Sequence, residues 1–159
     1  MKRIIIIWTV LLMMAASAEI VRGQTLPWTS IAHLGDSLRA NPKPLMVFIY
    51  TDWCKYCKMQ ENITFKDSEV IDLLKDNFYC LKIDAEDERT LTFMGRNYGP
   101  ATGGDFHPLA IMLGKENGKL LFPTTVFYFP NNQLIQRFQG LQGAKDLEKF
   151  IQKTDDSML

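Results

Sequence analysis

The sequence is poor in cysteine and histidine, which limits the metal and disulfide chemistry open to it. Its 159 residues contain three cysteines and two histidines. A structural zinc site uses about four nitrogen or sulfur ligands, usually as two spaced pairs. Besides Cys54 and Cys57, the chain offers only Cys80, His33 and His107, so we expect no resident metal. Three cysteines are also too few for a fold built on disulfides.

An excess of charge of one sign is absent as well. The chain has 18 basic and 18 acidic residues, and loss of Lys2 and Arg3 with an N-terminal leader would leave 16 basic residues. Binding to nucleic acid or to a membrane surface requires a basic excess, so we expect neither partner. The glycine-rich segment 99–107 lacks the Gly-Lys-Ser/Thr of a phosphate-binding loop, so we interpret it as a connection and expect no cofactor.

The chain has one long apolar run, and it stands at the N-terminus. Met1-Lys2-Arg3 precedes an apolar segment over 4–16, and Ala16-Ser17-Ala18 follows as a small-x-small cleavage site. This order is typical of a secretory signal peptide. The run is shorter than the roughly 20 residues of a membrane-spanning helix, although an uncleaved anchor stays open. We therefore predict a signal peptide over 1–18, with cleavage at Gly23 as second choice, and an exported protein that is periplasmic or secreted.

The remaining residues suffice for one domain. Hydrophobic residues make up 47% of the chain and aromatic residues 11%, which is enough for one core. We predict a single domain over 24–153, a flexible tail over 154–159, and a monomer.

Helix and strand patterns alternate along this domain. The expected order is a helix capped by Thr29 or Ser30, a strand over 45–51, a helix that begins at the cysteine pair, a helix capped by Asp67 or Ser68, a strand over 78–84, a helix over 86–98, strands over 124–129 and 134–138 joined by a turn at 130–133, and a final helix from Ala144.

Two cysteines one helical turn apart follow the strand expected over 45–51. Because Cys54 opens a helix, its thiol faces unpaired backbone N–H groups and the positive end of the helix dipole, which favour the thiolate. Cys57 lies on the same helical face and can attack a mixed disulfide formed by Cys54. This CxxC spacing is typical of thiol-disulfide exchange. A structural disulfide is the alternative, although so short a loop stabilises little. Haem attachment is excluded, because Lys58 stands where histidine is needed.

Two motifs resemble those of thioredoxin-fold proteins over roughly Pro44 to Lys153. They are Trp53-Cys54-Lys55-Tyr56-Cys57-Lys58 and Phe122-Pro123-Thr124-Thr125. Residues 50–70 are similar to the C-terminal periplasmic domain of bacterial transmembrane thiol:disulfide reductases and to related exported thioredoxin-like proteins. The resemblance implies an α/β thioredoxin fold, in which helices flank a central mixed β-sheet and an insertion precedes the cis-proline strand.

The resemblance also implies roles for matching residues. Pro123 matches the cis-proline that lies opposite the CxxC, where the neighbouring backbone pairs with an extended substrate strand. An ordinary trans proline is the alternative. Trp53 and Phe122 would contact the substrate, with burial in the core as the alternative for each. Lys55 and Tyr56 complete the expected substrate-binding set, and Lys55 adds a modest charge effect that favours the thiolate.

The chain departs from the family pattern in two respects. Many thioredoxins carry a buried acid on the strand before the CxxC and a lysine on the next strand, where this chain has Phe48 and Cys80. Proton transfer at Cys57 must then use water or another group. We expect Cys80 to be a buried, inert thiol, with a third redox partner as the alternative. Residues 85–122 exceed a compact crossover, so they contain an insertion that either frames a partner surface or is a tolerated loop.

Two classes of function fit these features. The favoured one is an exported thiol:disulfide oxidoreductase, with Cys54 and Cys57 as catalytic pair, that reduces disulfides in cysteine-containing proteins and draws electrons from a membrane thiol donor. Net oxidation or isomerisation is a variant. The other class is a non-catalytic module for protein binding or chaperoning. The intact CxxC together with Pro123 favours the enzyme, while the redox direction depends on the potentials of donor and acceptor.

Overall fold

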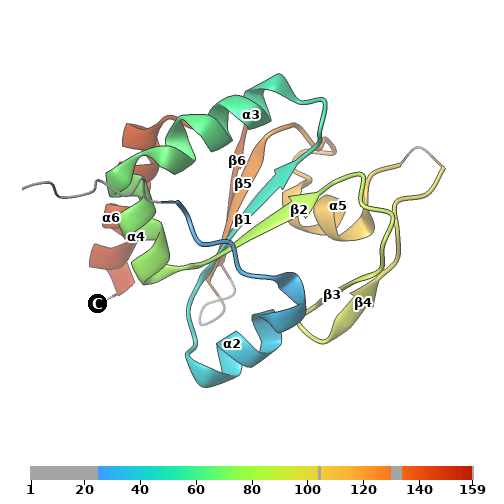
Figure 1. The fold of residues 1–159 in the computed structure, drawn as a ribbon, viewed down its shortest axis with the longest axis horizontal. Helices are drawn as coiled ribbons and strands as arrows, with labels where there is room; N and C mark the ends of the chain where they lie inside the picture. Colours follow the sequence, from blue (N-terminus) through green and yellow to red (C-terminus); the bar gives the residue numbers. More distant parts are fainter. Residues whose placement is uncertain (1–24, 104, 130–133, 159) are drawn as a thin grey trace, which may run out of the picture.

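A four-stranded mixed β-sheet lies between two layers of helices (Figure 1). The computed structural model describes residues 25–103, 105–129 and 134–158, so the predicted signal peptide and the turn at 130–133 lie outside the described residues. The strand order is β2-β1-β5-β6, in which β1 and β2 are parallel and the other neighbours are antiparallel. The strands are β1 (Leu45–Tyr50), β2 (Tyr79–Asp84), β5 (Thr124–Phe129) and β6 (Leu134–Gln139).

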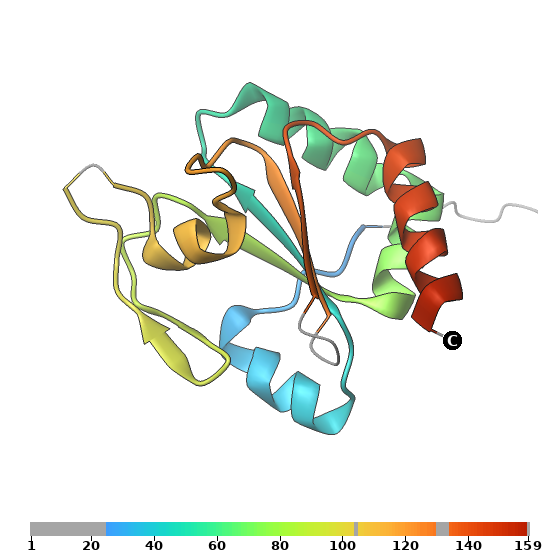
Figure 2. The same cartoon turned by 180° about the vertical axis from the view of Figure 1, so that it is seen from behind.

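Helices α3, α4 and α6 cover one face of the sheet (Figure 2). They are α3 (Lys55–Asn62), α4 (Ser68–Asn77) and α6 (Ala144–Met158), and the 3-10 helix η2 (Thr64–Lys66) joins α3 to α4. Because side chains alternate between the two faces of a strand, Met46 and Phe48 of β1 and Phe127 of β5 point into this layer. Both cysteines of the CxxC belong to the same buried cluster.

The opposite face of the sheet is covered by the N-terminal helices and by residues 85–122. The 3-10 helix η1 (Ile31–His33), α2 (Leu34–Ala40), the strands β3 (Leu91–Phe93) and β4 (Arg96–Tyr98), and α5 (Pro108–Gly114) form this layer. Val47 and Ile49 of β1 pack there against Leu109 and Leu113 of α5 in a second cluster. The sheet therefore separates the CxxC layer from the layer that contains the insertion.

The helix predicted over 86–98 is wrong, since this segment forms the hairpin β3–β4. Leu91 and Phe93 are buried whereas Thr92 is exposed, which is the two-residue period of a strand. Met94 and Gly95 both have positive φ, at 51° and 75°, as a two-residue hairpin turn requires. The helix of this region is α5, and His107 is its N-cap residue. The side chain of His107 accepts a hydrogen bond from the backbone N–H of Leu109 (3.1 Å).

The sequence makes a prediction at the start of α4 and another at the end of α6. α4 begins after Asp67, whose carboxylate accepts hydrogen bonds from the backbone N–H groups of Glu69 and Val70, so the predicted cap is confirmed. The sequence predicts a flexible tail over 154–159, and α6 continues through the first part of this segment to Met158. No glycine or proline follows Gly143, so the sequence contains nothing that ends the helix earlier.

Candidate active site

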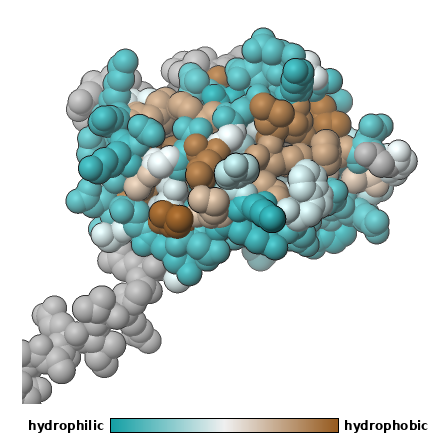
Figure 3. Space-filling model, turned by 90° about the horizontal axis from the view of Figure 1, so that it is seen from above, coloured by the Kyte–Doolittle hydropathy of each residue, from teal (hydrophilic) through white to brown (hydrophobic). Residues whose placement is uncertain are grey.

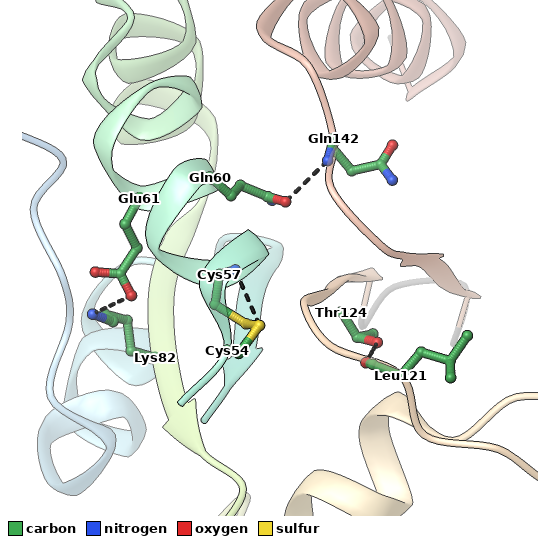
Figure 4. Close-up of a disulfide and its surroundings, with 8 residues drawn as sticks. All are labelled: Cys54, Cys57, Gln60, Glu61, Lys82, Leu121, Thr124 and Gln142. Carbon is green, nitrogen blue, oxygen red and sulfur yellow. Dashed lines mark hydrogen bonds and ion pairs between the residues drawn. A yellow bond between two sulfur atoms is a disulfide. The ribbon is translucent and has the colours of Figure 1, made fainter. Parts of the chain in front are cut away.

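Cys54 is the N-cap residue of α3, at the point where β1 leads into the helix. Its backbone is extended (φ −76°, ψ 105°), and its sulfur accepts a hydrogen bond from the backbone N–H of Cys57 at 3.1 Å (Figure 4). Cys54 and Cys57 form a disulfide with a Cα–Cα distance of 5.3 Å. The first cysteine therefore lies where unpaired N–H groups and the helix dipole stabilise negative charge on sulfur.

The two sulfurs lie at the edge of the core, and the residues around them are exposed. Cys54 is 5% exposed and Cys57 1%, whereas Trp53 is 62% and Tyr56 61% exposed. Lys55 is also exposed. In the view from above the molecule, apolar residues gather within a hydrophilic surround (Figure 3). Trp53, Lys55 and Tyr56, which are predicted to contact a substrate, are therefore accessible to a partner.

The segment around Pro123 lies beside the CxxC. The Phe122–Pro123 peptide bond is cis, as predicted. The ring of Trp53 packs edge-to-face on Phe122 (centroids 5.9 Å apart), and Phe122 packs in the same way on Phe106 (4.9 Å). Pro123 itself is buried, and Phe122 is half-buried. The residue before the cis-proline therefore contacts the residue before the first cysteine.

These features can be compared with known proteins. A family model described as a thioredoxin-like domain matches residues 36–155. The chain belongs to this thioredoxin-like family. With the disulfide between Cys54 and Cys57, the match identifies a thioredoxin-like thiol:disulfide oxidoreductase and confirms the predicted fold.

The relatives of this thioredoxin-like chain include thiol:disulfide interchange proteins. DsbD of Campylobacter jejuni (strain RM1221) is 30% identical over 119 residues, which are 75% of this chain and 18% of that protein. The chain thus spans less than a fifth of the curated relative. Among solved structures, the reduced C-terminal domain of Neisseria meningitidis DsbD has a TM-score of 0.51 at 18% identity and covers 80% of this chain and 98% of that one. A DsbH oxidoreductase has a TM-score of 0.53 at 18% identity, with 89% and 90% covered.

The thioredoxin-like core of this chain is apolar at the two positions where many thioredoxins are charged. Phe48 is fully buried and packs edge-to-face on Phe65 (5.0 Å) and stacks on Tyr50 (5.9 Å). Cys80 is free and 1% exposed, and burial raises the pKa of its thiol to about 12. The predicted buried thiol is confirmed, and at neutral pH it is protonated.

An ion pair that the sequence did not predict joins α3 to β2. Lys82 Nζ lies 2.9 Å from Glu61 Oε1 (Figure 4) and over the rings of Tyr50 (4.6 Å) and Trp28 (5.5 Å). Lys82 faces Phe48 in the strand register, so it lies on the CxxC face. Burial, together with the nearby carboxylate of Asp84, raises the pKa of Tyr50, so this phenol stays neutral in the physiological range.

A second contact missed from the sequence involves Trp53. Its indole N–H donates to Glu86 Oε1 at 3.0 Å. Glu86 follows β2, and its own backbone N–H donates to the carboxylate of Asp84 (2.9 Å). Burial raises the pKa of Asp84, although the hydrogen bond from Glu86 opposes this shift. Segment 85–122 therefore contacts the active-site tryptophan directly through Glu86 and Phe122, and Phe106 supports Phe122 from behind.

The two histidines take no part in this site. His33 is exposed, and His107 is fully buried between α5 and the β2–β3 connection, where its Nε2 lies 3.1 Å from the carbonyl oxygen of Arg89. Within the described parts of the chain, no three His, Cys, Asp or Glu side chains are grouped so as to hold a metal ion. No helix among the described residues is long and apolar enough to cross a membrane.

Proposed function

We propose that this thioredoxin-like chain is an exported reductase that reduces disulfides in cysteine-containing proteins. A membrane thiol donor then reduces its own Cys54–Cys57 disulfide. The single observation that carries the proposal is the position of Cys54, whose sulfur lies at the edge of the core at a helix N-cap, beside a cis-proline segment and two exposed aromatic residues. A module that only binds proteins has no need for two thiols at this spacing. The N-terminal sequence and the family relatives support export and a thiol donor.

The cycle begins with Cys54. Its thiolate attacks one sulfur of the substrate disulfide, and the other substrate sulfur leaves and takes up a proton. The mixed disulfide that results joins Cys54 to the substrate. The N–H of Cys57 donates to the attacking sulfur and α3 directs its dipole at it, so the thiolate is stabilised before attack.

Cys57 completes the cycle. Its thiolate attacks the sulfur of Cys54, the second substrate sulfur leaves as a thiol, and the Cys54–Cys57 disulfide forms. Two electrons have passed to the substrate, and an external dithiol must return them. Because Phe48 offers no carboxylate, the proton of Cys57 leaves through water or another group.

The substrate docks across the residues around the sulfurs. Trp53 and Tyr56 offer apolar rings, Lys55 offers a cation, and the backbone of Phe122 before Pro123 offers hydrogen-bonding groups for an extended strand. Edge-to-face packing of Trp53 on Phe122 joins these parts into one surface. Phe106 of the insertion packs on Phe122 and so supports this surface, which favours the interpretation of the insertion as part of a partner surface.

The reduction potential of the Cys54–Cys57 pair, measured by equilibration with glutathione and with thioredoxin, tests the direction. We expect a value near the thioredoxin range, about −270 mV, and reduction of insulin by the dithiol form. A value near that of a strong oxidant, about −120 mV, would contradict the reductase and favour net oxidation.

The roles of the two cysteines are tested separately. Cys57→Ser should accumulate a mixed disulfide with substrate, whereas Cys54→Ser should not form one. Faster alkylation of Cys57 than of Cys54 in the reduced protein would reverse the assignment. A Cys54→Ser/Cys57→Ser protein that still suppresses aggregation of an unfolded client as well as the wild type would favour the binding module instead.

A further inference from the structure

A fully buried glutamine lies one helical turn after the resolving cysteine. Gln60 and Cys57 are three residues apart on α3, so they share its inner face. Gln60 is 0% exposed, and the inner face of α3 that it shares with Cys57 packs in a largely apolar cluster. A buried amide of this kind is costly unless its donors and acceptor are paired, so its partners define what it does.

The partners of Gln60 lie on two other parts of the fold. Its Nε2 donates to the hydroxyl of Thr125 on β5 (2.8 Å), and its Oε1 accepts from the backbone N–H of Gln142, in the loop between β6 and α6, at 3.0 Å (Figure 4). Because a backbone N–H can only donate, the amide oxygen must face Gln142, which fixes the orientation of the side chain. The two bonds span 65 and 82 residues of sequence.

The same loop is bonded to the cis-proline segment. The backbone N–H of Gly140 donates to the carbonyl of Pro123 (2.7 Å), and the side chain of Gln142 donates to the carbonyl of Gly140 (3.1 Å). The hydroxyl of Thr64, just after α3, donates to the carbonyl of Gln142 (2.7 Å). These residues, which we call the Gln60 network, form a closed path from α3 through the loop to Pro123 and back through β5: Gln60, Thr64, Pro123, Thr125, Gly140 and Gln142.

We propose that Gln60 is a positioning residue for thiol-disulfide exchange, because its network fixes the distance between the CxxC helix and the cis-proline segment. The inference rests on the proposed exchange cycle, but not on its direction. It concerns the second step more than the first. Attack by Cys54 uses the local geometry of the helix N-cap. Resolution requires Cys57, the sulfur of Cys54 and a leaving sulfur on a substrate docked beside Pro123 to lie in line.

The two steps can be observed separately with a short extended peptide whose single cysteine carries a thionitrobenzoate leaving group. Attack by Cys54 on the peptide sulfur releases thionitrobenzoate, which is followed by absorbance. Attack by Cys57 on Cys54 then releases the peptide thiol and leaves the protein disulfide, which is followed by acid quenching and mass measurement of the adduct. Each step exchanges one thiolate for another, so no further oxidant is needed.

Gln60→Met retains the length of the side chain and removes both hydrogen bonds. We expect release of thionitrobenzoate to change less than about twofold, and decay of the peptide adduct to slow roughly five- to tenfold, because small displacements of reacting groups are costly. Thr125→Val should slow the second step in the same direction. If the network acts as a unit, the Gln60→Met/Thr125→Val double variant should slow the second step by less than the product of the two single-variant factors, so that its effect in free energy is less than the sum of the two.

Leu147→Ala is the control for lost stability, since Leu147 is a buried α6 residue outside the network. It should lower the unfolding midpoint and leave the ratio of the two rates unchanged. Equal slowing of both steps by Gln60→Met, or slowing of the second step by Leu147→Ala to the same extent, would overturn the proposal. If Gln60→Met fails to fold, Thr125→Val serves for the same measurement. A wild-type protein that forms no adduct would refute the exchange cycle itself, which is a different outcome.

Discussion

Replacement of Lys82 by methionine should destabilise the domain more than an ordinary surface ion pair would suggest. Lys82 lies over the rings of Tyr50 and Trp28 and contacts the carboxylate of Glu61, and its side chain is only 27% exposed. Methionine retains most of the apolar stem and removes the charge. The substitution therefore isolates the electrostatic and cation–π contributions from the packing of the stem.

The magnitude follows from these contacts. A partly exposed ion pair contributes about 0.5–1 kcal/mol, and each cation–π contact contributes about the same. The three contacts share one charge and are not fully additive, so we expect a loss of about 2 kcal/mol in the free energy of unfolding. With a urea m-value of about 2 kcal/mol/M, the unfolding midpoint should fall by about 1 M.

Two further variants make this test decisive. Glu61→Gln removes the ion pair alone and should cost about 0.5–1 kcal/mol. Lys75→Met removes a solvent-exposed pair with Asp72 on α4 and should leave the midpoint nearly unchanged. If Lys82→Met lowers the urea midpoint no more than Lys75→Met does, the aromatic contacts contribute nothing and the reasoning is refuted.

Three other predictions follow from single contacts. Burial raises the pKa of Cys80 to about 12, whereas an unfolded thiol titrates near about 8.5, so unfolding between these pH values releases a proton. The free energy of unfolding of the wild type should therefore fall by up to about 1.4 kcal/mol per pH unit between pH 9 and 12, relative to Cys80→Ala. The same pH dependence of the free energy of unfolding in both proteins over this range, from urea denaturation, would contradict this prediction. His107→Ala should cost about 2–3 kcal/mol through a lost helix cap and a cavity, and His107→Asn should recover about 1 kcal/mol in thermal unfolding, since asparagine can cap α5. Glu86→Ala removes the hydrogen bond that holds the indole of Trp53, which contributes about 0.5–1 kcal/mol at this exposed site, so KM for a protein disulfide should rise about two- to fivefold. An unchanged KM would show that Trp53 needs no such partner.

The features that the sequence predicts correctly are those determined by neighbours along the chain. The CxxC at a helix N-cap and the Asp67 cap depend on spacing over a few residues. The cis bond before Pro123 came from the resemblance of one short motif. The buried state of Cys80 followed from the apolar strand around it.

The features that it missed depend on contacts between distant residues. Nothing near Gln60 indicates that Thr125 and Gln142 will meet it, and the same holds for Glu86 and Trp53. The failed helix over 86–98 has a different cause. Its apolar residues fit a helical period about as well as a strand period, and only the glycine at 95, with its positive φ, distinguishes a hairpin.

The N-terminal stretch before η1 decides where the chain can be shortened. Leu26 is 5% exposed in the CxxC-side core, and Trp28 packs on Phe48 and Phe65 while the backbone N–H of Thr29 donates to the carbonyl of Cys80 at 2.7 Å. Processing at either predicted cleavage site removes none of these contacts. A recombinant chain that starts beyond Trp28, in contrast, would expose the outer edge of β2 and the rings behind it, and would be prone to pair with other strands.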